Sequence, residues 1–198
     1  ERMKRRLYRL AVVAWVVPSL LGARTGPEFS QFFLPKTLRV DHYHTGCRGQ
    51  EIISIDQLVE QPVWAGSRTN LLDTLNLGKY LVKVFDLQTN QLIYSRGFCS
   101  IFGEWETTEE ARGGVCRTFH ESALIPYPKR PIQFVIAKRA EGPYGHNHFV
   151  NLFSTVIDPE GVSIRTDLPR FPFDVRRVRY NGDPSKKVDL LILGDGYT

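Results

Sequence analysis

The chain has 198 residues, of which 42% are hydrophobic and 24% charged, and its formal net charge at pH 7 is +5. This composition is close to that of average globular domains, so it excludes a disordered chain and a fibrous repeat, and the length accommodates one domain of ordinary size. Residues 1–23 contain five basic side chains and one acidic side chain, which leaves a net charge of only +1 on the rest. A nucleic-acid-binding function, which needs a basic face on the folded domain, therefore loses its main support.

The first 23 residues have the pattern of a secretory signal peptide. A basic stretch at residues 4–9 precedes 14 mostly apolar residues, and small side chains at Gly22 and Ala23 lie near a cleavage point. The apolar run is too short for an ordinary helix that crosses about 30 Å of hydrocarbon. We therefore predict an exported protein, secreted or periplasmic, with a buried helix or a membrane anchor as the alternative.

Residues 24–35 are predicted to be a linker, because Gly26, Pro27 and Pro35 interrupt any regular pattern. From residue 36 onward, short β-rich runs alternate with turn residues. The predicted strands are 37–43, 51–55, 80–86, 91–95, 115–125, 131–138, 148–157 and 173–178.

Two local signals refine this pattern. Thr89 and Asn90 lie between two predicted strands and indicate a hairpin turn. Thr107 and Glu110 fit a capping box, which predicts a short helix that begins after Thr107 and ends at Gly113. Strands at this density, with no long helical pattern, favour an all-β fold, an antiparallel β-sandwich.

Tyr80 favours an immunoglobulin-like sandwich. It begins a predicted strand and follows Leu77 and Gly78. In immunoglobulin-like domains a tyrosine in such a position buries its ring and bonds through its hydroxyl to an upstream backbone group. A buried tyrosine without this role is the alternative.

The sandwich domain is predicted to cover residues 36–184, and residues 185–198 to begin another domain. The apolar run at 190–193 opens into a turn flanked by Gly194 and Gly196, which is typical of the start of a domain. We expect the chain to be the front of a longer protein whose next domain is truncated here.

Three cysteines, Cys47, Cys99 and Cys116, allow one disulfide in an oxidising compartment and leave one thiol over. The sequence does not decide the pairing. No CxxC pair occurs, which argues against a structural zinc site.

Histidines occur in two pairs, His42 with His44 and His146 with His148. On a strand, residues two apart project to the same face, as in a two-histidine metal site. Solvated or packed histidines are the alternative, and we predict no metal ligand among them.

Glu104, Glu106, Glu109 and Glu110 surround Trp105. Paired carboxylates can divide acid and base duties in glycoside hydrolysis, but helix capping and a solvated acidic turn also explain this group. The aromatic side chains that could form a stacking platform for sugars are Trp64, Tyr94, Trp105, Tyr127 and Tyr144.

Residues 94–111, YSRGFCSIFGEWETTEEA, resemble a signature of the N-terminal domain of the IgA-peptidase-type zinc metallopeptidases. Further segments similar to that family are 43–46 (YHTG), 64–67 (WAGS), 70–73 (NLLD), 119–129 (FHESALIPYPK) and 189–198 (DLLILGDGYT), the last resembling the opening of its α/β catalytic domain.

This resemblance implies a β-sandwich that precedes a secreted zinc peptidase domain. It also implies a downstream His-Glu-x-x-His helix in which two histidines hold zinc and the glutamate activates water. The sequence ends before such a helix, so we predict no catalytic, cofactor-binding or metal-binding residue in this chain and expect zinc only in the catalytic domain.

The predicted function is that of a non-catalytic module that supports the downstream catalytic domain or its access to protein substrates. Its partners would be that domain and those substrates, with neither nucleic acid nor a stable membrane span involved. An exported carbohydrate-binding or adhesive sandwich is the alternative from another class.

Residues 97–111 are a candidate contact surface of the module, because Phe98, Ile101, Phe102 and Trp105 place apolar bulk in a turn-rich segment. The alternative is that these side chains fill the core beneath a long loop.

Overall fold

The computed structural model describes residues 26–47, 49–142, 147–161, 163–167, 176–183, 187 and 190. The predicted signal peptide at 1–23 and most of the predicted domain start at 185–198 lie outside these residues. The elements are α1 (Phe29–Phe32), β1 (Phe33–Cys47), β2 (Gln50–Gln61), β3 (Tyr80–Asp86), β4 (Leu92–Phe98), α2 (Ile101–Trp105), α3 (Glu109–Arg112), β5 (Arg117–Pro128), β6 (Ile132–Glu141), β7 (Asn147–Ile157) and β8 (Ile164–Thr166).

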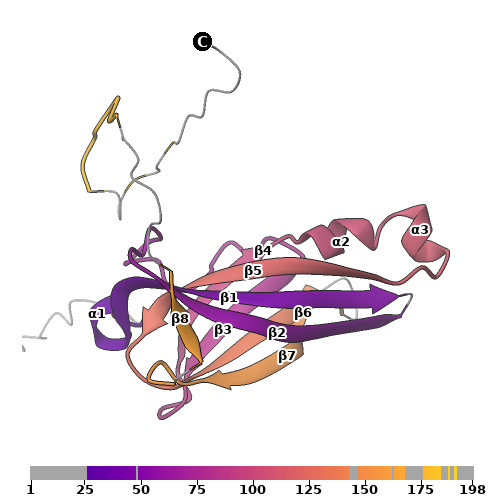
Figure 1. Ribbon diagram of the computed structural model, residues 1–198, viewed down its shortest axis with the longest axis horizontal. Coiled ribbons are helices and arrows are strands. Elements are labelled where there is room, and N and C mark those ends of the chain that lie inside the picture. The colour runs from indigo at the N-terminus through magenta and orange to yellow at the C-terminus, as the bar shows by residue number, and fades with distance from the viewer. Residues whose placement is uncertain are drawn as a thin grey trace, which may run out of the picture.

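The strands form two four-stranded sheets with the orders β5-β1-β2-β8 and β4-β3-β6-β7. All neighbouring strands are antiparallel except β2 and β8, which are parallel. The predicted all-β sandwich is therefore confirmed. β1, the longest strand, lies between β2 and β5 and runs most of the length of the sandwich (Figure 1).

The core lies between the sheets and follows the period of two that strands impose on their side chains. In β3, Tyr80, Val82 and Val84 are buried, and Phe134 and Ile136 of β6 are buried opposite them. These side chains belong to one continuous apolar cluster. A second, smaller cluster consists of Phe102, Trp105 and Ala111.

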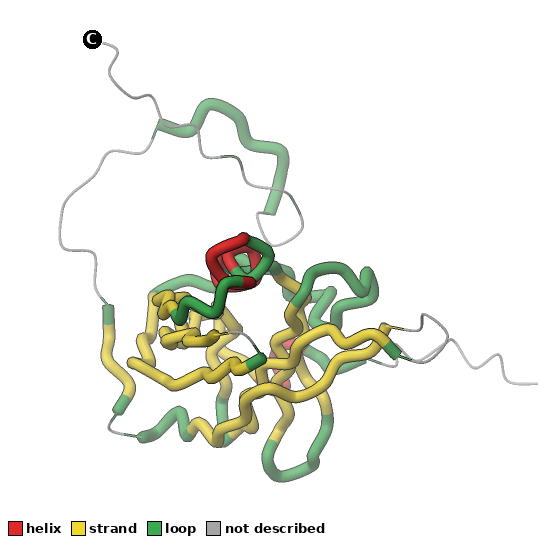
Figure 2. Tube along the Cα trace, turned by 90° about the vertical axis from the view of Figure 1, so that its right-hand side faces the viewer, coloured by secondary structure: helices red, strands yellow, loops and turns green. Residues whose placement is uncertain are grey.

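The helices lie at the two ends of the sandwich. α1 lies at one end, and α2 and α3 lie at the other, beyond β4 and beside β5 (Figure 1). Figure 2 looks onto the second end, where the helices lie above the strands.

The predicted linker at 24–35 is wrong from Phe29 onward. Phe29 and Phe32 of α1 and Phe33 at the start of β1 are buried in the main core. Burial of three aromatic rings outweighs the flanking glycine and prolines, because each ring removes a large apolar area from water. The sheet therefore begins at Phe33 and not near residue 36.

The predicted capping box is wrong, although a helix does form here. The N-cap is Thr108 and not Thr107, and its hydroxyl accepts a hydrogen bond from the Ala111 amide. Glu110 binds Arg117 and the Trp105 indole nitrogen instead of reaching back. α2, where the Ser100 hydroxyl accepts from the Gly103 amide, was not predicted. α2 contains Gly103, a weak helix former, so its capping and tertiary contacts determine its conformation.

The predicted hairpin is confirmed. β3 and β4 pair antiparallel, and Asn90 takes a positive φ of 56° in the turn. The buried carboxylate of Asp86 accepts from the amide and hydroxyl of Thr89 and from Arg130. Asp86 thus fixes this turn and joins it to the residues that precede β6.

The C-terminal strands differ from the prediction. β8, which consists of only three residues and pairs with Leu58, Val59 and Glu60 of β2, was not predicted. Residues 176–178 of the predicted strand at 173–178 have no strand conformation, and residues 173–175 lie outside the described residues.

Candidate functional site

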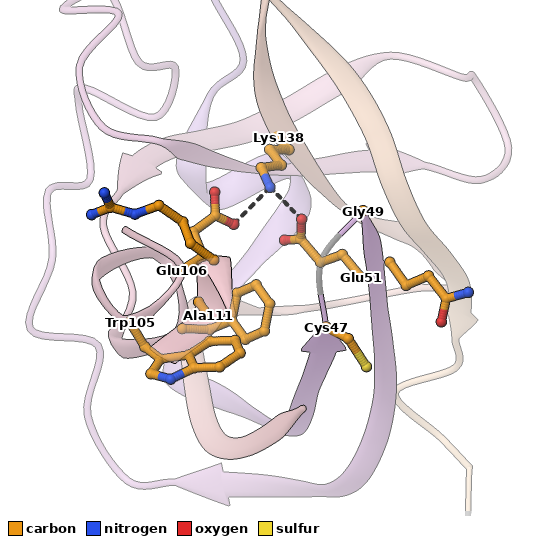
Figure 3. Close-up of a pocket in the computed structure, with 10 residues that line it drawn as sticks. Cys47, Gly49, Glu51, Trp105, Glu106, Ala111 and Lys138 are labelled. Carbon is orange, nitrogen blue, oxygen red and sulfur yellow. Dashed lines mark hydrogen bonds and ion pairs between the residues drawn. The ribbon is translucent and has the colours of Figure 1, made fainter. Parts of the chain in front are cut away.

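An open cavity of about 490 Å³ lies at the end of the sandwich that carries α2 and α3. Its lining residues are Cys47, Gly49, Gln50, Glu51, Phe102, Trp105, Glu106, Ala111, Arg112 and Lys138. In Figure 3, the Lys138 ammonium lies between the carboxylates of Glu51 and Glu106, and Trp105 lies on the other side. The cavity therefore has one charged wall and one apolar wall.

Strand register places charged side chains on the inner faces of both sheets at this end. Glu121 of β5 has the same parity as the buried Ala123 and Ile125, and Glu51 of β2 has the parity of the buried Ile53. Lys138 continues the inward series of Phe134 and Ile136 in β6. Charged groups thus replace apolar ones where the sandwich opens towards α2.

His44 occupies the centre of this group. It pairs with Phe119 of β5 and Ile53 of β2, so Glu121 and Glu51 are its diagonal neighbours. Its Nδ1 lies 3.0 Å from Glu121 Oε2, and its Nε2 lies 2.8 Å from Glu51 Oε1. With both nitrogens protonated, the imidazolium donates one hydrogen bond to each carboxylate.

The network continues through Glu51 into the second sheet. The Tyr80 hydroxyl donates to Glu51 Oε1 at 2.8 Å, and Lys138 donates to Glu51 Oε2. Lys138 also donates to Glu106 Oε2 at 2.8 Å, and Lys79 forms an ion pair with the other oxygen of Glu106.

The Tyr80 contact corrects the expected tyrosine corner. The ring is fully buried, as predicted, but the hydroxyl bonds to a side-chain carboxylate of the other sheet and not to an upstream backbone group. Tyr80 therefore does not form a tyrosine corner, and its position does not favour an immunoglobulin-like sandwich over another sandwich. A buried charged acceptor within reach forms a stronger hydrogen bond than a neutral carbonyl.

Mutual hydrogen bonding keeps these groups ionised despite burial. Burial opposes ionisation of Glu51, but hydrogen bonds from His44, Lys138 and Tyr80 lower the pKa of Glu51 to about 2. Burial also opposes ionisation of Glu121, yet the nearby His42 and the hydrogen bonds from His44 and the Phe102 amide lower the pKa of Glu121. The pKa of His44 is raised, because its two carboxylate partners outweigh the effect of burial.

The same contacts decide what the group can do chemically. A general base needs a nitrogen or oxygen available to substrate, whereas both ring nitrogens of His44 are occupied by carboxylates. Among the described residues, every buried side-chain nitrogen and oxygen has a hydrogen-bond partner. The arrangement is a closed ion network that joins both sheets to α2.

Within the described part of the chain, no group of three or more His, Cys, Asp or Glu side chains is arranged to hold a metal ion. His42 and His44 are both buried, and both approach Glu121, with His42 Nε2 at 3.7 Å. His148 lies exposed in β7, and His146 lies outside the described residues.

The glutamates around Trp105 do not form a carboxylate pair that faces a common space. Glu106 is occupied by two lysines, and Glu110 binds Arg117 and the Trp105 indole nitrogen. Glu104 and Glu109 are exposed. Salt bridges and helix termini therefore account for this cluster.

Four of the aromatic side chains that could form a stacking platform for sugars are buried, at 9% exposure or less: Trp64, Tyr94, Trp105 and Tyr127. Tyr144 lies outside the described residues. The four buried side chains belong to the apolar clusters of the domain, as aromatic residues of a sandwich core do.

Residues 97–111 contribute mainly to packing and only in part to the surface. Phe102 and Trp105 are buried in the small cluster with Ala111, whereas Phe98 is partly buried and Ile101 is 60% exposed. Phe119 of β5 packs against this cluster.

The cysteine pairing is settled by strand register. Gly46 of β1 lies opposite Arg117 of β5, so Cys47 and Cys116 are adjacent and form a disulfide. Cys99 is free and exposed. A disulfide is typical of proteins in oxidising compartments.

A family model described as "Peptidase M64 N-terminus" matches residues 28–150. The chain belongs to this family. The matched segment begins beside α1 and ends within β7, so it covers most of the sandwich but not β8. No curated protein matches the chain. Among the described residues of this M64 N-terminal domain, no helix is both long and apolar enough to traverse a bilayer.

The ion network predicts loss of stability in acid. The pKa of Glu51 is about 2 in the folded protein and 4.5 in a free side chain, so its contribution is complete above pH 4.5 and disappears as the pH falls towards 2. The shift corresponds to about 3 kcal/mol. Urea unfolding followed by circular dichroism between pH 6 and pH 2 measures this loss.

A Glu51→Gln protein is the matched control, because it lacks the titrating group. Its unfolding free energy should be lower at pH 6 and should decline less steeply with acid. Equal slopes for the two proteins would show that Glu51 does not cause the loss.

Proposed function

We propose that the chain is the non-catalytic N-terminal module of a secreted zinc metallopeptidase of the IgA-peptidase type. The module supports the downstream catalytic domain or the access of protein substrates to that domain. The observation that carries this proposal is the match of residues 28–150, which form most of the sandwich, to the N-terminus of a peptidase family.

The ion network supports a structural role for the most reactive side chains. The network joins side chains from four strands: His44, Glu51, Glu121 and Lys138. It leaves neither ring nitrogen of His44 available to a substrate. In this proposal these side chains close the end of the sandwich, and catalysis belongs to the domain that follows.

Two further observations support export of the protein and the presence of a downstream zinc domain. The disulfide between Cys47 and Cys116 fits an oxidising compartment, in agreement with a signal peptide at residues 1–23. Residues 189–198 resemble the opening of a zinc peptidase domain. Zinc would be bound by a His-Glu-x-x-His motif in that domain and not by residues of the sandwich.

The division of labour predicts that peptidase activity requires the downstream domain. The full-length protein should cleave casein, and a chelator should abolish the cleavage. The fragment of residues 26–183 should be inactive with or without zinc. Peptide release is measured for both at equal concentration.

Full-length protein with glutamine in place of the glutamate of the zinc motif controls for contaminating peptidases. Chelator-sensitive cleavage by the fragment alone would contradict the proposal. A full-length protein that cleaves no protein substrate after zinc loading would contradict it as well.

A further inference from the structure

Residues 99–116 connect β4 to β5 and carry α2 and α3; we call this segment the helical arm. It covers the end of the sandwich, beside the cavity (Figures 1 and 3). Its buried apolar side chains, Phe102, Trp105 and Ala111, form a cluster separate from the main core. Segments with few buried apolar contacts are those that open locally while the rest of a domain stays folded.

Charged groups of the sandwich hold the arm. Glu121 of β5 accepts a hydrogen bond from the Phe102 amide at 2.9 Å. Glu106, directly after α2, binds Lys138 of β6 at 2.8 Å and also binds Lys79. Each of these contacts joins the arm to a different strand or loop, and each depends on the charge of its partner.

His44 lies directly beneath the arm. Its ring stacks on that of Phe102 with centroids 4.0 Å apart and an angle of 15° between the planes, and Tyr80 of β3 contacts it edge-on. Glu121 from β5 and Glu51 from β2 occupy its two nitrogens.

The remaining charged groups around His44 complete a balanced set. Lys138 from β6 binds both Glu51 and Glu106, and Lys79 binds Glu106. His42, its neighbour in β1, approaches Glu121 at 3.7 Å. Three carboxylates therefore face the His44 imidazolium and two lysine ammonium groups.

We propose that His44 is a proton-controlled latch for the helical arm. While both ring nitrogens carry protons, the arm stays seated on the sandwich, and loss of one proton releases it. The disulfide at Cys116 keeps the C-terminal end of the arm attached to β1, so the arm hinges outward and uncovers Phe102 and Trp105.

Release of the arm is expected whether His44 loses the proton on Nδ1 or the proton on Nε2. A bare Nδ1 would direct its lone pair at Glu121, whose other oxygen holds the Phe102 amide. A bare Nε2 would face Glu51, whose other oxygen holds Lys138 and, through it, Glu106. An anchor of the arm therefore lies behind each nitrogen.

The arm is also the part that can move. Loss of the imidazolium charge leaves three carboxylates with two cations in a region of low dielectric, which is unfavourable. The side chain of Glu106 is 26% exposed, whereas Glu51 and Glu121 are 10% and 8% exposed. The Glu106 carboxylate can become solvated with the least rearrangement. Because Glu106 directly follows α2, its displacement moves the helical arm.

The direction of the switch follows from the environment of His44. Burial opposes its protonation, but its two carboxylates outweigh burial and raise the pKa of His44 above 6.5. The latch therefore opens as the pH rises through the raised pKa of His44, at a higher pH than an unperturbed histidine would set.

Hydrogen exchange measured by mass spectrometry on the whole chain tests the latch. Protection factors, which correct for the intrinsic pH dependence of exchange, should fall about tenfold or more for residues 99–116 between pH 6 and pH 9. Peptides from β3 and β6 should keep their protection. The Cys99→Ser protein is used, because an exposed thiolate at pH 9 would attack the disulfide.

Two variants and one titration separate the possible causes. His44→Gln should lower the protection of the arm at both pH values, whereas His120→Gln, which alters an exposed histidine paired with Asp56, should leave the wild-type change intact. The imidazole signals of His44 in NMR spectra of the Cys99→Ser protein should titrate with the same midpoint as arm protection. Arm protection that does not change with pH, or that changes at a different midpoint, would overturn the proposal even if His44→Gln fails to fold.

Discussion

Replacement of Cys47 and Cys116 by serine is expected to lower the free energy of unfolding by about 4 kcal/mol. The disulfide closes a loop with a sequence separation of 69 residues, and a cross-link of that length removes much of the conformational entropy of the unfolded chain. It also fixes the open end of the sandwich, where β1, β5 and the helical arm meet. Chemical denaturation of the double variant and the parent protein measures the difference.

Cys99→Ser is the matched control for this experiment, because Cys99 is exposed and has no disulfide partner. It should change the unfolding free energy by no more than about 0.5 kcal/mol. A double variant as stable as the parent would show that the strand pairing of β1 with β5 is sufficient to hold this end.

Replacement of Glu121 by alanine is expected to cost about 3–5 kcal/mol. The change leaves the His44 imidazolium without one of its two carboxylates and the Phe102 amide without its acceptor. Removing one partner of a buried charged pair costs more than the pair itself contributes, because the other charge stays buried. Urea unfolding at pH 6, where His44 is protonated, measures the effect.

Glu104→Gln removes the same charge from an exposed position in α2 and should change stability by about 0.5 kcal/mol or less. A cycle with His44→Gln then measures the coupling between Glu121 and His44. A loss below about 1 kcal/mol for Glu121→Ala would mean that water solvates this end of the sandwich and that the network is not buried.

The sandwich could be predicted because short β-rich runs alternate with turn residues along the sequence. β3 was predicted at its observed residues 80–86, a run rich in aromatic and β-branched side chains. The prediction failed where packing overrides local pattern. Phe29 and Phe32 lie in a stretch rich in glycine and proline, and only their contacts with the core make α1 form.

The ion network was not predicted, although the two-residue period of strands is sufficient to place its members on the inner faces of the sheets. Counting by twos from Ala123 places Glu121 on the inner face of β5, and counting from Ile53 does the same for Glu51. Counting by twos from Leu38 and Val40 likewise places His44 on the inner face of β1. Which residues lie beside it depends on the pairing of β1 with β2 and β5, and the alternation of a single strand does not give that pairing. The contacts of His44 therefore depend on the register of three strands.

The pairing of the cysteines could not be predicted either, because it also depends on strand register. Local sequence treats Cys47, Cys99 and Cys116 alike, since their spacings match no known framework. Only the alignment of Gly46 with Arg117 brings two of them together.

The central position of β1 in its sheet has a consequence for folding. β1 is the first strand of the domain, yet its neighbour β5 begins only at Arg117, so one side of β1 stays unpaired until much of the domain has been synthesised. Pairings between distant segments form slowly, and an uncovered strand edge recruits other chains. We expect refolding in the range of milliseconds to seconds, and nascent chains that end before β5 should aggregate.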